Sequence, residues 1–304
     1  MTISVLIPTY RRPQDLCRCL AALAAQTRPA DEVLVVVRDT DTETRAFLAD
    51  APPLPGLRLV SVGVPGVLAA MSAGLDLATG DIVALTDDDT APYPDWLARI
   101  EAHFNADPNV GGVGGRDWQP NDHRSRAVVG KIQWHGRVIG NHHLGVGDAR
   151  EVDILKGANC AYRAAPLKKI GFDTRLRGEG AQAHWELALG MAMRRDGWKL
   201  IYDPKVALDH FIAQRFDEDT NHRGFFQSTG LTNSVHNETL ILLTYLPPLR
   251  RLAFLAWAFF AGTRVEPGLL QVPRLLRRRE KNIGMRLSAV YAGRLAAIRT
   301  NDHS

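Results

Sequence analysis

The sequence predicts an α/β protein whose core is a mostly parallel β-sheet with helices on both faces. Strand-like and helix-like segments alternate four times between residues 3 and 106. The strand-like runs, for example "VLVVV" at 33–37, are apolar without a break instead of at every second residue, which indicates strands buried on both faces. Buried strands that alternate with helices are typical of a parallel sheet.

Each element of this first part has its own local signal. "ISVLIP" at 3–8 is a short β-branched run ended by a proline, and leucines recur on one helical face between Pro13 and about Gln26. We expect Gly80 to cap the helix that precedes it. The further expected strands are 32–37, 57–62 and 81–86, and the further expected helices are 41–50, 66–80 and 93–104.

After residue 110 the pattern becomes looser. "VGGVGGRDW" at 110–118 is rich in glycine and carries no clear period. We expect two short strands, a loop and a short helix within 152–172, a helix within 184–198, and two short strands in 199–211 that Pro204 separates. From about Thr239 the chain is expected to be helical and increasingly basic.

Composition bounds the class of protein. A chain of 304 residues with 45% hydrophobic and 23% charged residues is ordinary for a globular protein, which excludes wholesale disorder. Three cysteines make a poor disulfide framework, so we expect a reducing compartment, namely the cytoplasm. We expect no signal peptide and no transmembrane span, because the longest apolar candidate, 252–262, is far shorter than the roughly 18–20 residues needed.

Charge is distributed unevenly along the chain. Between residues 250 and 299 there are eleven lysines and arginines against two glutamates, whereas the whole chain carries only +4. A basic tail on an otherwise acidic body indicates an anionic surface as its partner. Two interpretations of 252–262 remain open: a helix buried against the core with a solvated basic face, or an interfacial membrane anchor.

Three adjacent carboxylates, Asp87, Asp88 and Asp89, directly follow the strand expected at 81–86. In open α/β sheets the ligand crevice lies beyond the carboxyl ends of the parallel strands. An Asp-x-Asp at that edge suits a hard divalent cation such as Mg²⁺ or Mn²⁺, which takes carboxylate and phosphate oxygens as ligands. The alternative is an ordinary acidic turn before Pro92.

Taken together, the motifs resemble the family 2 glycosyltransferases of the GT-A fold. The resemblance runs from Ser4 to His210, and its motifs occur in the expected order. It implies a Rossmann-like, mostly parallel sheet flanked by helices, followed here by a helical C-terminal extension. The stretches that carry it are "SVLIPTYRRP", "EVLVVV", "GDIVALTDDD" with a following "WL", "GANCAYR", "RRDGW" and "DPKVALDH".

The resemblance implies a nucleotide site at the ends of the first, second and fourth strands. Two departures stand out: Arg38 occupies a position where an aspartate is more usual, and Met71 and Ser72 replace a common Arg-Asn pair. Asp87 is expected to lean towards the ribose as well as the metal. The implied nucleotide-binding residues are Pro8, Thr9, Tyr10, Arg12, Asp39, Asp87 and Asp88.

The resemblance also implies the metal, sugar and catalytic residues. Asp87, Asp89 and His210 would hold Mn²⁺ or Mg²⁺. Glu186, at the start of a helix whose amide dipoles keep a carboxylate ionised, is expected to be the catalytic base, with Glu179 as the alternative. The residues implied to face the donor or acceptor sugar are Gly157, Asn159, Glu179 and Trp185.

The expected activity is the inverting, non-processive transfer of one sugar from a nucleoside diphosphate sugar, with UDP favoured. The Gln-x-x-Arg-Trp motif of processive synthases is missing, and "AQRFDED" at 213–219 is the nearest stretch. The expected acceptor is a saccharide or a lipid-linked oligosaccharide, in cell-surface or exopolysaccharide biosynthesis. We expect no nucleic-acid partner, and the oligomeric state stays open.

Two other functions remain open: a nucleotidyltransferase of similar fold, and a catalytically silent membrane-bound sugar-binding subunit. The expected location is the cytoplasm or the cytoplasmic face of the inner membrane. Three parts are expected along the chain: a nucleotide-sugar-binding half at 1–110, an acceptor-binding and catalytic half at 111–235, and a helical basic extension at 236–304.

Overall fold

The computed structural model describes residues 1–50, 54–120, 122–214, 216 and 226–302. The chain divides into two compact units, which are described separately. Unit 1 comprises Met1–Lys131, Ile139–Phe172 and Leu189–Gln214, and unit 2 comprises Ile132–Val138, Asp173–Ala188 and Arg215–Ser304. The three-part division expected from the sequence stays a prediction, and "AQRFDED" lies largely outside the described residues.

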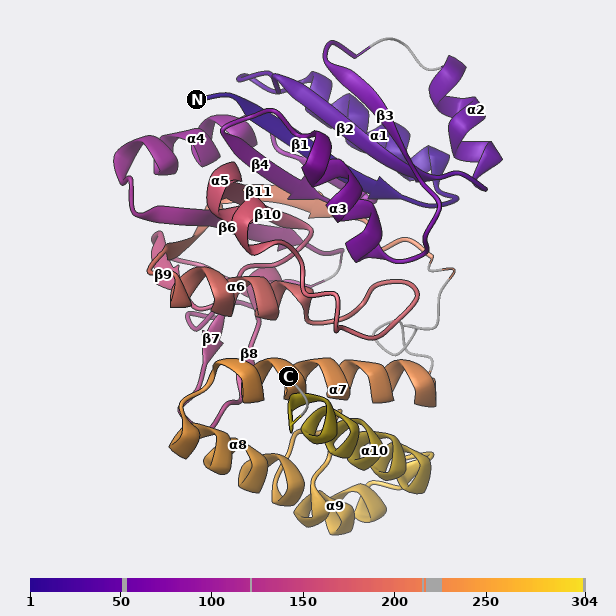
Figure 1. The fold of residues 1–304 in the computed structure, drawn as a ribbon, viewed down its shortest axis with the longest axis vertical. Helices are drawn as coiled ribbons and strands as arrows, with labels where there is room; N and C mark the ends of the chain where they lie inside the picture. The colour runs from indigo at the N-terminus through magenta and orange to yellow at the C-terminus, as the bar shows by residue number, and fades with distance from the viewer. Residues whose placement is uncertain (51–53, 121, 215, 217–225, 303–304) are drawn as a thin grey trace. The chain divides into compact units, whose positions relative to one another are not determined.

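Unit 1 is built on one β-sheet with the strand order β3-β2-β1-β4-β10-β6-β11-β5, and β9 pairs with β11 (Figure 1). The four strands expected in the first part are all present, and they pair in parallel. Beyond them, β10 runs antiparallel to both β4 and β6. The strands are β1 (Ile3–Thr9), β2 (Glu32–Arg38), β3 (Leu57–Val62), β4 (Ile82–Thr86), β5 (Thr90–Pro92), β6 (Val110–Trp118), β9 (Arg150–Val152), β10 (Asn159–Arg163) and β11 (Lys199–His210).

The helices of the first part also follow the predicted order. Pro13 begins α1 at a position where an N–H would have no intrahelical partner, so the missing N–H of proline costs no hydrogen bond. The Asp41 carboxylate accepts the Thr44 N–H and caps α2. The remaining elements outside the sheet are α1 (Pro13–Ala24), α2 (Thr42–Asp50), α3 (Val67–Leu77), α4 (Trp96–Ala106), β7 (Lys131–Ile132), β8 (Val138–Ile139), η1 (His142–Leu144), α5 (Ala164–Ile170) and α6 (Trp185–Arg195).

Helices cover both faces of the sheet, which explains why its strands are apolar throughout. One face of β1, with Val5, packs in a buried cluster with Leu16 of α1 and Trp96 of α4. On the other face, α3 approaches so closely that a Cβ on Gly74 would lie 2.6 Å from the Leu6 side chain. The predicted α/β architecture is therefore confirmed.

The glycine-rich segment 110–118 is a central strand, β6, which the sequence pattern did not indicate. A Cβ on Gly115 would lie 1.8 Å from the Val206 carbonyl oxygen of β11, so a side chain is impossible there. The glycines permit close contact between backbones, although glycine lowers strand propensity. The predicted break at Pro204 is wrong: β11 is one strand whose register with β6 shifts between Asp203 and Ala207.

The predicted glycine cap of α3 is also wrong. The helix ends at Leu77, and Ala78 occupies the cap position with extended backbone angles. Gly80 lies instead against β1, where its N–H donates to Ser4 Oγ at 2.9 Å and a Cβ would meet the Ser4 nitrogen at 2.6 Å. Glycine is needed at this position for close approach, not for chain reversal.

Unit 2 is mainly helical. Its long helices α7 and α10 pack through a small core of Leu231, Val235, Ala289 and Val290, and helical structure begins at Ser228, earlier than the predicted Thr239. No helix among the described residues is long and apolar enough to cross a bilayer. The helices are α7 (Ser228–Tyr245), α8 (Pro248–Phe260), η3 (Leu269–Gln271), α9 (Val272–Arg277) and α10 (Ile283–Asp302).

Candidate active site

The acidic triplet forms a tight turn between β4 and β5 at the carboxyl edge of the sheet. Thr90 Oγ1 donates to the Asp87 carbonyl at 2.8 Å and holds the turn closed. Thr90 also pairs with His210 in the ladder between β5 and β11, and the Phe211 N–H donates to the Asp89 carbonyl. The sheet therefore brings the end of β11 to the acidic turn.

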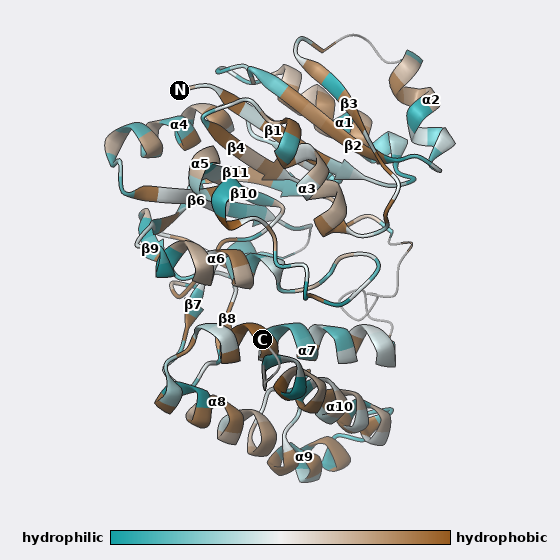
Figure 2. Cartoon of the chain, in the orientation of Figure 1, coloured by the Kyte–Doolittle hydropathy of each residue, from teal (hydrophilic) through white to brown (hydrophobic). Residues whose placement is uncertain are grey.

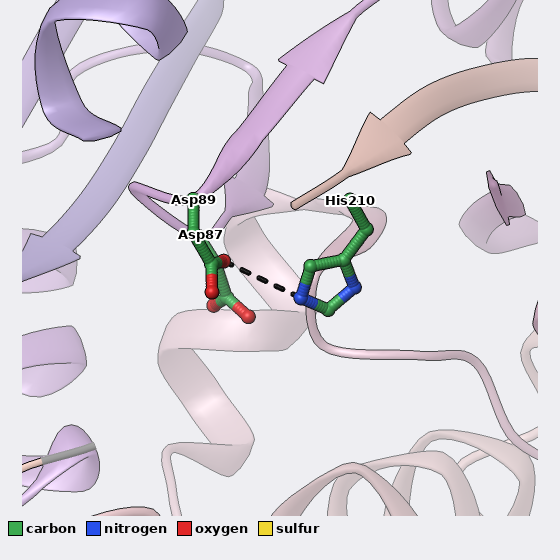
Figure 3. Close-up of side chains that lie close together, drawn as sticks. All are labelled: Asp87, Asp89 and His210. Atoms are coloured by element: carbon green, nitrogen blue, oxygen red, sulfur yellow. Dashed lines mark ion pairs between the residues drawn. The ribbon is translucent and has the colours of Figure 1, made fainter. Parts of the chain in front are cut away.

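Asp87, Asp89 and His210 converge on one point. Each offers one ligand atom, and these atoms all lie within 4.8 Å of one another. Figure 3 shows both carboxylates directed towards the imidazole ring, with Asp89 Oδ1 3.3 Å from His210 Nε2. Asp89 and His210 are nearly fully buried, so their positions are fixed by the fold.

This donor set fits a divalent cation. Two carboxylate oxygens and one imidazole nitrogen suit Mn²⁺ well, while Mg²⁺ prefers oxygen alone. The far side of the ring is held as well, because His210 Nδ1 lies 3.3 Å from Asp117 Oδ2 on β6. A carboxylate behind a ligand histidine fixes the ring and leaves the other nitrogen directed at the cation.

Within this cluster, neighbouring groups of opposite charge shift the pKa values of His210 and Asp89. Burial alone would lower the pKa of His210, but hydrogen bonds to Asp117 and Asp89 raise it to about 9. Burial alone would raise the pKa of Asp89, whereas His210 and Arg12 hold it well below its usual value. Because a histidine must be neutral to coordinate, a cation here would displace the proton of the imidazole.

Arg12 and Thr9 bind the middle carboxylate. Asp88 is completely buried, with Thr9 Oγ1 donating to its Oδ2 at 2.6 Å and Arg12 Nη2 lying 2.8 Å from its Oδ1. Burial raises the pKa of Asp88 to about 7 in spite of these contacts. Asp88 is thus a structural link between β1 and the acidic turn, and Arg12 also reaches Asp89 at 3.4 Å.

The ends of β1 and β2 lie side by side. Pro8 and Thr9 pair with β2, and the Tyr10 ring that follows has the guanidinium of Arg38 5.5 Å from its centroid. Asp39, the first residue after β2, is exposed. Its carboxylate is accessible at this edge of the sheet, and its contact with a nucleoside stays a prediction.

Asn159 and Gly157 belong to the turn that leads into β10. The Asn159 side chain is fully buried, and both of its polar atoms are hydrogen-bonded. Its oxygen accepts from Trp96 Nε1 at 2.8 Å, and its amide nitrogen donates to the Arg116 and Val206 carbonyls. The structure gives Asn159 a structural role, and its contact with a sugar stays a prediction. Gly157, two residues earlier in the same turn, is buried as well.

Glu186, Trp185 and Glu179 belong to unit 2. Glu186 lies in the first turn of α6 and is half-buried, Trp185 beside it is buried, and Glu179 is exposed in the preceding loop. Asn237 of α7 holds this loop at both ends, donating to the Arg177 and Ala183 carbonyls and accepting the Arg177 N–H. Helix α7 therefore anchors the loop that leads to Glu186, the expected catalytic base.

Sequence reasoning missed three residues that shape these sites. Asp117 was hidden in the glycine-rich segment, where no period suggested a strand. Asn237 and His184 lie in polar stretches without a motif, and His184 Nε2 lies 3.0 Å from Ser234 Oγ on α7. Polar contacts between residues far apart in the chain follow no fixed spacing, so the sequence pattern could not reveal them.

Comparisons with known proteins agree with this geometry. The profile of the family described as "Glycosyltransferase like family 2" matches residues 2–236. A glucosyl-dolichyl phosphate glucuronosyltransferase of Haloferax volcanii is 24% identical over 225 residues, which span 70% of each chain. The succinoglycan biosynthesis protein ExoM of Rhizobium meliloti is 32% identical over 102 residues, about a third of each chain.

Two solved structures share the fold. The mannosyltransferase PcManGT of Pyrobaculum calidifontis, solved with GDP-Man and Mn²⁺, has a TM-score of 0.56 at 21% identity and covers 98% of this chain and 86% of its own. S. aureus TarS 1–349, solved with UDP-GlcNAc, has a TM-score of 0.58 at 18% identity and covers 100% and 91%. The GT-A fold expected from the sequence is confirmed, and the chain belongs to the family 2 glycosyltransferases.

Proposed function

We propose that this protein is an inverting, metal-dependent glycosyltransferase that moves one sugar from a nucleoside diphosphate sugar to a saccharide acceptor. The observation that carries the proposal is the convergence of Asp87, Asp89 and His210 at the carboxyl edge of the sheet. Residues 1–110 would bind the donor, 111–235 the acceptor, and 236–304 form a basic extension.

The donor half of the proposal assigns a task to each group at the edge. Asp87, Asp89 and His210 would hold Mn²⁺ or Mg²⁺, which would neutralise the diphosphate as it leaves. Tyr10 and Asp39 would contact the nucleoside. UDP is favoured as the nucleotide, and the solved relatives with GDP-Man and with UDP-GlcNAc support a nucleotide-sugar donor of this kind.

The catalytic half of the proposal rests on Glu186. Its carboxylate would take the proton of an acceptor hydroxyl as that oxygen attacks the anomeric carbon, while the bond from this carbon to the diphosphate breaks on the opposite side. The result is inversion, with the proton on Glu186 and the charge on the diphosphate. The first turn of α6 supports this role, because amide dipoles there favour an ionised carboxylate.

The acceptor is proposed to be a saccharide carried on a lipid, used in cell-surface or exopolysaccharide biosynthesis on the cytoplasmic face of the inner membrane. The support comes from the names of two relatives, one acting on glucosyl-dolichyl phosphate and one in succinoglycan biosynthesis.

Two measurements test the proposal. Calorimetric titration with UDP, GDP and dTDP should show binding that requires Mn²⁺, and absence of binding to all three would overturn it. Glu186→Gln keeps the size and hydrogen bonding of the side chain but removes the base, so turnover should fall by ~10²-fold or more with donor affinity unchanged. An active Glu186→Gln beside an inactive Glu179→Gln would move the base to Glu179.

A further inference from the structure

Helix α8 carries two apolar faces, of which the fold uses one. Phe254 and Ala258 are completely buried within unit 2. On the other side, Leu249, Leu252 and Phe260 are 68%, 66% and 56% exposed. Their spacing of three and then eight residues, with the exposed Ala256 between, places them in one stripe about 16 Å long.

The exposed apolar surface continues along the chain beyond α8. Leu269 and Leu270 of η3 are 52% and 71% exposed, and Leu276 of α9 is 61% exposed. Figure 2 shows hydrophobic residues on both α8 and α9. Since η3 packs against both α8 and α9, these side chains belong to neighbouring elements of one unit. We call this set of exposed side chains the apolar face, defined by Leu249, Leu252, Phe260, Leu269, Leu270 and Leu276.

Cations flank the apolar face at its α9 end, and all of them are exposed. Between residues 248 and 283 only two acidic residues occur. Glu280 forms an ion pair with Arg264 and lies within electrostatic range of Arg278, and Glu266 is held by the buried Arg294, so the cations outnumber the carboxylates here. The exposed cations are Arg274, Arg277, Arg278, Arg279 and Lys281.

From this combination we propose that the apolar face docks onto an anionic lipid bilayer. Large aliphatic and aromatic side chains would enter the boundary between headgroups and acyl chains, and the arginines beside them would meet lipid phosphates. A second copy of the chain fits the surface poorly, because a two-fold contact through the same face would bring one cationic cluster to another. An exposed patch of this kind marks an interaction site.

This inference rests on the proposed function and adds how the enzyme would reach an acceptor that is carried on a membrane lipid. It also bears on the two interpretations of residues 252–262. The structure shows that α8 is a core helix through Phe254 and an exposed apolar helix through Leu252 at once. One side of α8 packs in the core of unit 2, and the opposite side exposes apolar side chains. Truncation would therefore damage the fold, and point substitutions on the exposed side are the proper test.

The experiment is vesicle flotation of the full-length protein. Vesicles of phosphatidylcholine with 30% phosphatidylglycerol should retain the protein at low salt and release it at higher salt, because screening weakens the basic contribution. The triple substitution of Arg274, Arg277 and Arg278 to alanine should lower the partition coefficient on the order of 100-fold. Leu252→Glu with Leu270→Glu should lower it by at least roughly 10-fold even at low salt.

Matched controls alter surface groups outside the apolar face. Leu59→Glu changes an exposed leucine of β3, and alanine at Arg137, Lys169 and Lys205 removes three exposed cations elsewhere. Both controls should bind vesicles like the wild type. Binding of Mn²⁺ and nucleotide, measured on the same samples, should be unchanged in every variant, which separates failure of docking from failure of the proposed function.

Three results would overturn the proposal. The first is wild-type protein that ignores anionic vesicles at low salt. The second is equal loss in the control variants, which would make the effect one of net charge. The third is a dimer by light scattering that Leu252→Glu dissociates while vesicle binding persists, because the apolar face would then belong to a second copy.

Discussion

Buried carboxylates gather in both units, but the two groups are charged differently. In unit 1, burial would raise the pKa of Asp89, yet His210 and Arg12 hold it below its usual value. In unit 2, burial and the nearby charge of Glu238 raise the pKa of Glu266 to about 8, although Arg294 Nη2 lies 3.4 Å away. Asp89 accepts hydrogen bonds from His210 and from the Ala213 N–H that stabilise its charge, whereas Glu266 lies beside the like charge of Glu238.

The comparison shows what distinguishes a binding cluster from a structural one. In unit 1, Asp87 and Asp89 converge with His210, and the low pKa of Asp89 keeps this carboxylate ionised and able to receive a cation. The unit 2 cluster has one arginine for two carboxylates, and the proton on Glu266 closes the charge balance. Burial of acidic groups alone is therefore no sign of a metal site.

The largest effect is expected where the unit 1 cluster loses a carboxylate that faces the cation. Asp89→Ala should abolish Mn²⁺-dependent nucleotide binding in calorimetric titration, with Asp89→Asn as the variant that keeps the shape of the turn. Asp107→Ala, which removes an exposed carboxylate paired with Lys199, should bind normally. Unchanged affinity in both Asp89 variants, with and without EDTA, would return the triplet to an ordinary acidic turn.

A smaller effect of a different kind is expected in unit 2. The folded pKa of Glu266 lies above the ordinary glutamate value of 4.5, so between pH 4.5 and about 8 this side chain is ionised in the unfolded chain and protonated in the folded one. Folding stability should therefore fall as pH rises, by at most about 1.4 kcal/mol per pH unit in that window.

Glu266→Gln tests this slope by urea unfolding at pH 5 and pH 8. The variant should lose less stability than the wild type over this range, because its side chain does not titrate. Glu280→Gln, on the surface, should keep the wild-type slope. If Glu266→Gln and the wild type respond to pH alike, the buried carboxyl is ionised and the contrast between the units disappears.

The smallest of the three effects is expected at Asp117. This residue is not one of the expected metal ligands, but its carboxylate contacts the ring of His210, which is one. Asp117→Asn should lower Mn²⁺ affinity by about 10–100-fold, the usual scale for the partner of a ligand histidine. Electron paramagnetic resonance titration measures the affinity, and histidine NMR reports the altered ring protonation. Asp209→Asn is the control on the same edge. Equal Mn²⁺ affinity in the wild type and Asp117→Asn would reduce Asp117 to a structural group.

Sequence patterns predicted the elements that repeat and missed those that depend on contact. The first four strands and the acidic triplet carry local signals, since apolar runs and adjacent carboxylates are visible in any short window. β6 was missed because its glycines serve the close approach of Val206 in β11. Pro204 was wrongly taken as a break, since a shifted register accommodates it within one strand.

The candidate site divides in the same way. His210 entered through the family resemblance, whereas Asp117 and Asn237 have no motif and act only through partners far along the chain. A contact of this kind is decided by which strands or helices become neighbours. Local spacing contains no information about that choice.

The pairing of β5 with β11 has a consequence for synthesis of the chain. Thr90 pairs with His210 in this ladder, and just beyond β11 the Ala213 N–H donates to Asp89 Oδ2 across 124 residues. The acidic turn therefore leaves the ribosome long before the strand that completes it. Contacts this distant form late in folding. The cluster that would hold a cation cannot exist in a nascent chain shorter than about 213 residues. Mn²⁺ and nucleotide would then act as a final check on unit 1, stabilising only those molecules whose last sheet strand is in place.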